Sequence, residues 1–164
     1  MQQNKNGFTL VEIVVVVAII GLLATLTSLK VVQIINRGRS NAAGVDLSNI
    51  ATATMQLAWD TGRWPNRAVR TTPGSVEVWD LSKGSAGLGS NGGNYPDWKG
   101  PYYLGETLDP WGNPYFFDPD YRVNGVNKVV VGSFGANGKG RNYYDEDDVF
   151  VVLETMELFV PNLK

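Results

Sequence analysis

The chain has 164 residues, of which 43% are hydrophobic, with no cysteine, no histidine and a formal net charge of -2. This length accommodates one long helix and one compact domain. The lack of thiols and imidazoles excludes cysteine nucleophiles, histidine general bases and the usual soft zinc or iron sites. The acidic surplus also disfavours nucleic acid as a partner, because phosphate backbones attract basic surfaces.

An apolar run near the start of the chain extends from Phe8 to Leu29, and its only charged side chain is Glu12. A helix of this length, at about 1.5 Å per residue, reaches across a hydrocarbon core of about 30 Å. We therefore predict a transmembrane and polymerisation helix over residues 8–30. A carboxylate in an apolar span is costly, so Glu12 is predicted to have a functional role and a cationic partner.

The residues before this run are short and polar, and Gly7 is followed directly by Phe-Thr-Leu-Val-Glu. This pattern resembles the leader of type IV filament proteins. The resemblance implies that a prepilin peptidase removes residues 1–7 by cutting between Gly7 and Phe8. It also implies that Phe8 becomes N-methylated and that Glu12 governs subunit assembly. The alternative is an ordinary membrane anchor or an uncleaved secretory signal, neither of which requires Glu12.

The charges that flank the apolar run do not decide its orientation in a membrane. Lys5 on one side is opposed by Lys30, Arg37 and Arg39 on the other, and charge counting alone would place the C-terminal domain in the cytoplasm. The leader resemblance instead implies a single-pass protein of the bacterial inner membrane, with its domain in the periplasm. Assembly would then move the subunit into an extracytoplasmic filament.

The helical period continues beyond the apolar run with mixed chemistry, which predicts an amphipathic outer half of the helix over residues 31–61. We expect the helix to end near Asp60, because Thr61-Gly62 and Trp64-Pro65 are stop signals. The side chains expected on its packed face are Val31, Ile34, Ile35, Ala42, Val45, Leu47, Ile50, Thr54, Leu57 and Ala58.

Residues 62–164 are predicted to form an exported, turn-rich domain with a small antiparallel sheet, which makes the whole chain an α+β protein. Aromatic and β-branched content indicates strands at 115–117, 128–134 and 149–153, with 118–127 as a hairpin connection. Trp111, in a rigid Pro-bracketed turn, is predicted to pack in the core. The blocks WPN, KGPYYL and DPWGNPYFF resemble the major pseudopilin of type II secretion systems. The tail after Glu154 is left without a role.

A Gly-rich segment that begins at Ser133 ends in the acidic run Asp145 to Asp148. The pseudopilin resemblance implies one calcium ion here, with Asp145 and Asp148 as the main side-chain ligands and Asp147, Asn137 and Ser133 as further candidates. Consecutive carboxylates repel one another unless a cation neutralises them, and calcium accepts irregular sets of oxygen ligands. The alternative is a solvated acidic turn without a metal.

Together these features predict a structural filament subunit and not an enzyme. The resemblance implies self-assembly into a homopolymer, the inner membrane before assembly, and partners that include an assembly platform protein, its ATPase and minor pseudopilins. An alternative is a type IV pilin for adhesion, motility or DNA uptake, although such pilins typically carry a C-terminal disulfide loop. A third possibility is a membrane-tethered periplasmic binding domain or enzyme, which would need a pocket with convergent polar groups.

Overall fold

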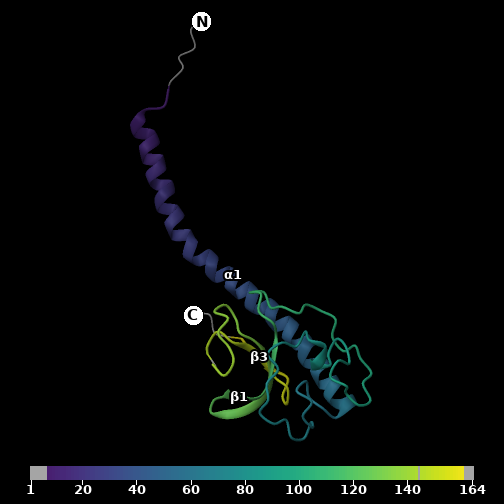
Figure 1. Ribbon diagram of the computed structural model, residues 1–164. Helices are drawn as coiled ribbons and strands as arrows, with labels where there is room; N and C mark the ends of the chain where they lie inside the picture. Colours follow the sequence, from purple (N-terminus) through teal and green to yellow (C-terminus); the bar gives the residue numbers. More distant parts are fainter. Residues whose placement is uncertain (1–6, 144, 161–164) are drawn as a thin grey trace. The chain divides into compact units, whose positions relative to one another are not determined.

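The computed structural model of the protein describes residues 7–143 and 145–160, with the side chains of residues 25–30, 157 and 158 outside the description. Two compact units are present, residues 1–36 and residues 37–164. The predicted leader lies outside the described residues apart from Gly7. The elements in chain order are α1 (Leu10–Thr61), the 3-10 helix η1 (Gly84–Ala86), β1 (Phe116–Val123), β2 (Val126–Ser133), β3 (Val149–Val152) and β4 (Glu157–Phe159) (Figure 1).

Helix α1 ends at Thr61, which confirms the predicted stop. Gly62 follows with a φ of 67°, a left-handed conformation that costs glycine nothing because it has no Cβ. The Thr61 hydroxyl donates a hydrogen bond of 2.7 Å to the Leu57 carbonyl in the last helical turn. The helix therefore ends through local backbone chemistry, as the sequence indicated.

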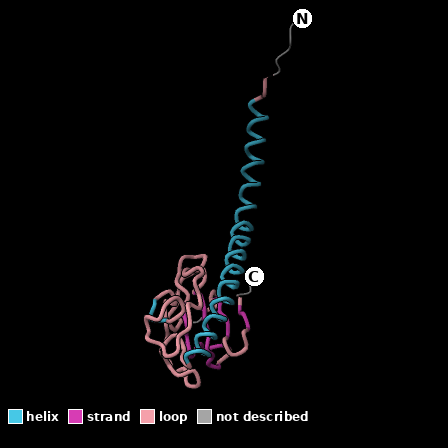
Figure 2. The backbone as a smooth tube through the Cα atoms, turned by 90° about the vertical axis from the view of Figure 1, so that its right-hand side faces the viewer, coloured by secondary structure: helices cyan, strands magenta, loops and turns pink. Residues whose placement is uncertain are grey.

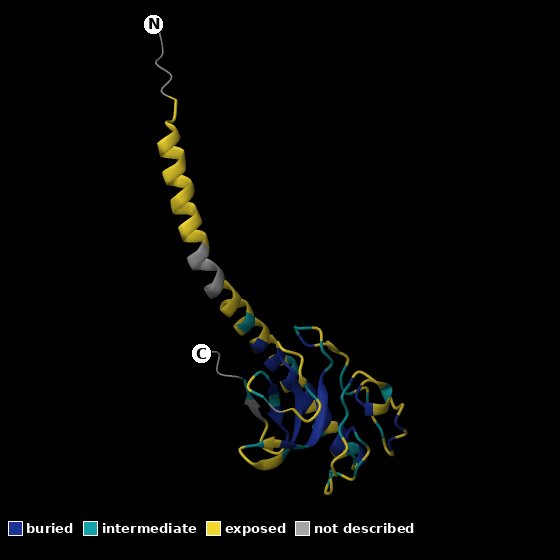
Figure 3. Cartoon of the chain, turned by 60° about the vertical axis from the view of Figure 1, so that its left-hand side comes forward, coloured by how far each residue is buried: buried dark blue, intermediate teal, exposed yellow. Residues whose placement is uncertain are grey.

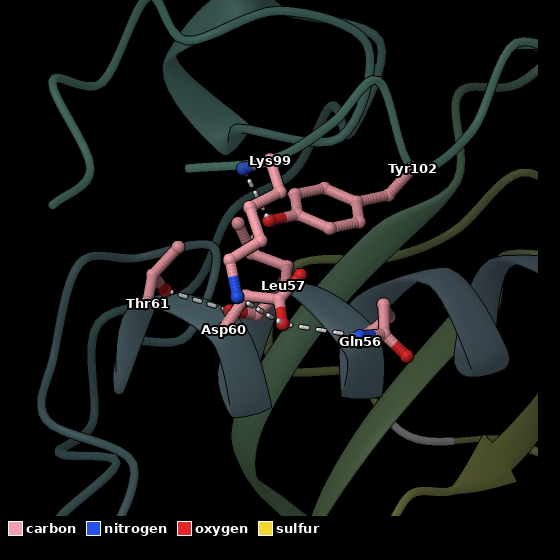
Figure 4. Close-up of polar contacts among 6 residues, drawn as sticks. All are labelled: Gln56, Leu57, Asp60, Thr61, Lys99 and Tyr102. Carbon is pink, nitrogen blue, oxygen red and sulfur yellow. Dashed lines mark hydrogen bonds and ion pairs between the residues drawn. The ribbon is translucent and has the colours of Figure 1, made fainter. Parts of the chain in front are cut away.

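A small polar network holds a distant loop against this helix end (Figure 4). The Asp60 carboxylate accepts a hydrogen bond of 3.2 Å from Gln56 Nε2 and lies 3.6 Å from Lys99 Nζ. The Gln56 hydrogen bond lowers the pKa of Asp60, and the Lys99 charge adds to this effect. The Tyr102 hydroxyl accepts a hydrogen bond of 3.0 Å from the Lys99 amide. Residues 99–102 are thereby fixed beside the last turn of α1.

The buried face of α1 in the second unit differs from the predicted face at two positions. Leu47, Ile50 and Leu57 are buried as expected, whereas Ala42 and Val45 are exposed, with 64% of Val45 accessible. At 100° per residue Val45 lies on the far side of the helix from Leu47. The prediction for Ala42 and Val45 was wrong because it took too broad an apolar face.

The four strands form one antiparallel sheet in the order β1-β2-β3-β4, and it lies beside the C-terminal part of α1 within the second unit (Figure 2). The predicted connection over 118–127 was wrong, because β1 and β2 continue through most of it and meet at Asn124-Gly125. Both turn residues have positive φ, 50° and 81°, as tight hairpin turns require. Pro119 is tolerated because the register shifts between Asp118 and Tyr121.

Alternate side chains of the sheet enter two separate apolar clusters. Phe117, Val131 and Val151 lie on the face that packs with α1, where Trp64 also stacks on Phe117. The opposite face carries Phe116, Tyr121, Val130, Phe134 and Val152, which pack with Trp79, Phe150 and Phe159. Because both faces are covered, Val129, Val130 and Val131 of β2 are all buried, and the strand shows no clean alternation of apolar and polar residues.

The tail and the turn before β1 also join the packed domain. Phe159 of β4 stacks on Phe150 of β3, with ring centroids 4.8 Å apart, so the tail that the sequence left unassigned supplies a fourth strand. Trp111 packs against the cluster that contains α1, which confirms its predicted core role. The predicted α+β fold, a long helix with a small antiparallel sheet, is confirmed.

Candidate functional site

The first candidate site is the N-terminal end of α1, where a capping arrangement starts the helix. The Glu12 amide donates a hydrogen bond of 3.3 Å to the Thr9 hydroxyl oxygen, and Thr9 immediately precedes the first helical residue, Leu10. A Thr followed three residues later by Glu is a capping box, in which the acidic side chain also favours the positive end of the helix dipole. The backbone of Glu12 thus takes part in the helix cap, while the role of its carboxylate in assembly stays a prediction.

The apolar side chains of this segment lie exposed in the described chain, and Figure 3 shows the helix before residue 25 exposed on all its sides. Among the described residues, no helix is both long enough and apolar enough to cross a membrane. The predicted span over 8–30 includes residues 25–30, whose side chains lie outside the description. The exposed large side chains are Phe8, Leu10, Val11, Ile13, Val14, Val15, Val16, Val17, Ile19, Ile20, Leu22 and Leu23.

The second candidate site is the acidic loop, where the structure brings Asn137, Asp145 and Asp147 together. The Asp145 carboxylate accepts hydrogen bonds from Asn137 Nδ2 at 2.8 Å and from the Asp147 amide at 2.9 Å. The Asp147 carboxylate accepts one from the Asn137 amide at 3.0 Å. Gly135 makes this approach possible, because a Cβ there would collide with the Asp147 carbonyl oxygen.

Asp148 lies at the inner end of the loop and is only 4% exposed. One carboxylate oxygen accepts a hydrogen bond of 2.6 Å from the Tyr121 hydroxyl, while the other is buried without a hydrogen-bond partner. Burial raises the pKa of Asp148 to about 7, and the negative charge of Asp145 adds to the shift. A buried carboxylate oxygen without a partner is costly, and a bound cation would supply the missing partner.

Ser133 faces away from the acidic run, toward a residue that the sequence did not single out. Its hydroxyl donates a short hydrogen bond of 2.5 Å to Asp109, which is itself buried. Asp109 also accepts hydrogen bonds from the amides of Trp111 and Asn113, and the Asn113 side chain reaches the Gly135 carbonyl. Asp109 therefore joins the turn before β1 to the start of the acidic loop. The Asp-Pro pair was the available signal, because Asp commonly closes such turns.

No cluster of three or more Asp, Glu, His or Cys side chains in the described part of the chain is gathered closely enough to hold a metal ion. The structure thus places Asp145, Asp147 and Asn137 in one hydrogen-bonded group, with Asp148 turned to Tyr121 and Ser133 turned to Asp109. The chemistry that this loop offers is a set of carboxylate oxygens that can face a cation.

Comparison with known proteins bears directly on both sites. The family described as the prokaryotic N-terminal methylation motif matches residues 2–28. The type II secretion system core protein G of Xanthomonas campestris pv. campestris is 31% identical over 149 residues, which cover 88% of each chain. The protein of that name from Pseudomonas aeruginosa is 31% identical over 90% of this chain and 95% of its own length. The protein of that name from Aeromonas hydrophila is 29% identical over 90% of this chain and 92% of its own length. No solved structure gives a significant match.

The N-terminal match and the capped apolar helix define the class, which is that of proteins with a prepilin-type methylation motif. The relatives narrow this class, because two of them share 31% of their residues with the chain over 88% or more of their own length. The chain belongs to the family of type II secretion system core protein G. The resemblance predicted from the sequence is therefore confirmed.

Proposed function

We propose that this chain is the major structural subunit of a pseudopilus-like filament that serves type II protein secretion. The observation that carries this proposal is the run of twelve large apolar side chains, Phe8 to Leu23, that are all exposed. Soluble proteins rarely leave such a continuous apolar surface uncovered, so another surface must cover it. The names of the relatives support secretion as the setting.

Two environments can cover this segment in succession. Before assembly, lipid of the inner membrane surrounds the helix and the domain of residues 62–164 lies in the periplasm. After a prepilin peptidase has cut between Gly7 and Phe8, helices of neighbouring subunits replace the lipid contacts. The exchange requires a platform protein, its ATPase and minor pseudopilins as partners. The subunit itself acts as a structural element and not as an enzyme.

Glu12 has a specific place in this proposal. Its carboxylate lies in the first turn of α1, close in sequence to Phe8, whose amine becomes the N-terminus after cleavage. In a staggered stack of helices, a neighbour's Phe8 amine is the cation best placed to neutralise Glu12. A buried ion pair contributes more to register than to stability, so this pairing would fix the axial step between subunits.

The acidic loop is proposed to bind one calcium ion through oxygen ligands. The ligands we propose are Asp145 and Asp147, which gather around Asn137, and the buried oxygen of Asp148 that lacks a partner. These carboxylates would have to move closer together on binding, because the described residues hold no three acidic side chains at metal-binding distance. The Asn137 side-chain oxygen accepts a hydrogen bond of 2.7 Å from the Lys139 amide, so Asn137 would become a ligand only if this bond were given up. Ser133 is the weakest candidate because its hydroxyl is held by Asp109. Bound calcium would neutralise the loop and fix its conformation.

The filament role is tested by removing the gene and examining secretion and surface pili in the same strain. We expect secreted proteins to accumulate in the periplasm while pilus-based motility and adhesion remain, and a plasmid copy to restore secretion. Intact mass spectrometry of assembled subunits should show a mature chain that starts at N-methylated Phe8. Normal secretion together with lost motility would contradict the secretion role and favour a type IV pilin.

A further inference from the structure

A basic loop follows α1 directly and contains no acidic residue of its own. Arg63, Arg67 and Arg70 fall within eight positions, and residues 61–76 contain no Asp or Glu. The ion pairs of the described residues are Lys83 with Asp80, Lys99 with Asp60 and Lys128 with Glu154, so none involves these arginines. Residues 44–164 hold 10 basic and 15 acidic side chains, which makes this loop an isolated positive surface on an acidic domain.

The arginine loop is held firmly by its own contacts. The Arg70 amide bonds to the Gly62 carbonyl at 2.8 Å, and the Trp64 amide bonds to the Ala68 carbonyl at 3.0 Å, which closes a short hairpin. Trp64 anchors this hairpin in the core by stacking on Phe117. The arginines therefore project from a fixed scaffold, which lowers the entropy that a binding partner must overcome.

Two of these arginines form one wall of a groove whose opposite side comes from a distant loop. The groove is lined by Arg63, Arg67, Gly93, Asn94, Tyr95 and Pro96. The Tyr95 hydroxyl joins the two sides by donating a hydrogen bond of 2.6 Å to the Pro65 carbonyl. One guanidinium nitrogen of Arg63 bonds to the Arg67 carbonyl, and the remaining guanidinium donors suit a planar carboxylate.

The third arginine extends the surface with an aromatic side chain. The Arg70 guanidinium lies 4.2 Å from the ring centroid of Trp59, and 62% of this tryptophan is exposed on α1. Tryptophan and arginine dominate the residues that carry binding energy in protein interfaces. The combination of an arginine groove with an exposed, cation-stacked tryptophan is thus typical of a protein-binding surface.

We propose that this groove receives the acidic loop of a second copy of the chain, with Glu146 as the carboxylate that enters it; the proposal rests on the filament function above. Glu146 is the loop carboxylate best suited to this role because it is exposed, whereas Asp145 and Asp147 accept hydrogen bonds from Asn137 and Asp148 is buried. Two different surfaces that meet between copies make a head-to-tail contact, which generates an open helical array.

The contact is tested in filaments of the full-length chain by disulfide trapping, which is clean because the chain has no cysteine of its own. Filaments that carry both Arg67→Cys and Glu146→Cys should yield a ladder of dimers and larger multimers on oxidation. Each single variant should remain monomeric, as should the control pair Arg122→Cys with Glu146→Cys, since Arg122 is exposed in β1.

Charge reversal gives a second, independent measurement. Arg67→Glu should reduce filament yield about tenfold, and adding Glu146→Arg to the same chain should restore it, because like charges in an interface repel. The control Arg122→Glu should leave the yield unchanged. If the wild type forms filaments but the Arg67→Cys with Glu146→Cys chain gives no ladder and the charge swap gives no rescue, this contact alone is overturned. A wild-type chain that forms no filaments would instead overturn the proposed function.

Discussion

Two stretches of helix α1, residues 10–24 in the first unit and residues 43–61 in the second, both carry large apolar side chains but have opposite surroundings. Ile19, in the first unit, is 54% exposed, whereas Ile50, in the second unit, is 1% exposed. The second stretch is covered by the sheet and the turns of its own domain, while the first stretch is left uncovered by the described residues of its unit. The comparison teaches that one helix can serve folding at one end and assembly at the other. Each end should therefore respond to a different substitution.

Glu12→Ala is expected to have the largest effect because it removes the only charge of the first stretch. Filament formation should be lost almost completely, since no carboxylate remains to pair with a neighbour's N-terminus and set the register. The domain should stay folded, because Glu12 lies outside residues 37–164. Electron microscopy of sheared filaments and subunit immunoblots would measure the loss.

The matched control for Glu12 is Val16→Ala, four residues further along and also exposed. It shortens an apolar side chain without changing charge, so filaments should form at reduced but clear abundance. Filaments of normal abundance from Glu12→Ala would contradict the assembly role.

Ile50→Ala and Ile19→Ala apply the same truncation to the two stretches. At the buried position, the lost contacts and the cavity should lower the free energy of unfolding by about 2–5 kcal/mol. At the exposed position the domain should melt as the wild type does. All five tryptophans lie between residues 59 and 111, so tryptophan fluorescence of detergent-solubilised protein reports on the second unit alone. A lower melting point for Ile19→Ala would show that the first stretch supports the domain.

The difference between the two stretches of α1 was largely predictable from the sequence, because the signals that determine it are local. The Thr-x-x-Glu cap, the unbroken apolar run and Gly62 each lie within a few residues of the feature that they determine. The hairpin turn at Asn124-Gly125 was also within reach, since Asn-Gly is a strong turn signal, but all of 118–127 was predicted as the connection. The register shift that lets β1 continue past Pro119 is not visible in the sequence.

The candidate metal loop was less predictable because its contacts join distant residues. Tyr121 bonds to Asp148 across 27 residues, and Asp109 bonds to Ser133 across 24. A single sequence indicates that carboxylates are clustered along the chain, but not which of their oxygens already have partners. The same limit applied to the tail, whose pairing with β3 requires the fold to be known.

Calcium is expected to affect only the second unit. If the ion binds the folded domain alone, calcium at about 100 times its dissociation constant should stabilise it by about 2.7 kcal/mol. Fluorescence melting with calcium and with chelator measures the difference, and Asp145→Asn should abolish it. Asp97→Asn is the matched control, because Asp97 is exposed and remote in sequence from the loop. Equal melting points for the wild type under both conditions would identify the acidic run as a solvated turn.

The smallest expected effect concerns Asp118, a fully buried carboxyl in β1. Burial raises its pKa to about 7, and the negative charges of Asp120 and Glu77 act in the same direction, although the Asp120 amide donates a hydrogen bond of 2.9 Å to the carboxylate. Because its unfolded pKa is near the ordinary value of about 3.9, the folded state binds the extra proton between these two pH values. The stabilisation is therefore complete below about pH 4 and is lost as the pH rises through about 7.

Asp118→Asn isolates this contribution, because asparagine keeps the shape and cannot ionise. Wild-type protein in chelator should lose unfolding free energy steadily between about pH 4 and pH 7 relative to the variant. Asp148 contributes a slope of the same sign in both proteins, since burial raises its pKa too, and so cancels in the comparison. The first stretch of α1 carries no buried carboxyl among its described residues, so this dependence of stability on pH belongs to the second unit. Parallel stability curves for the two proteins would show that Asp118 is already ionised in the folded state.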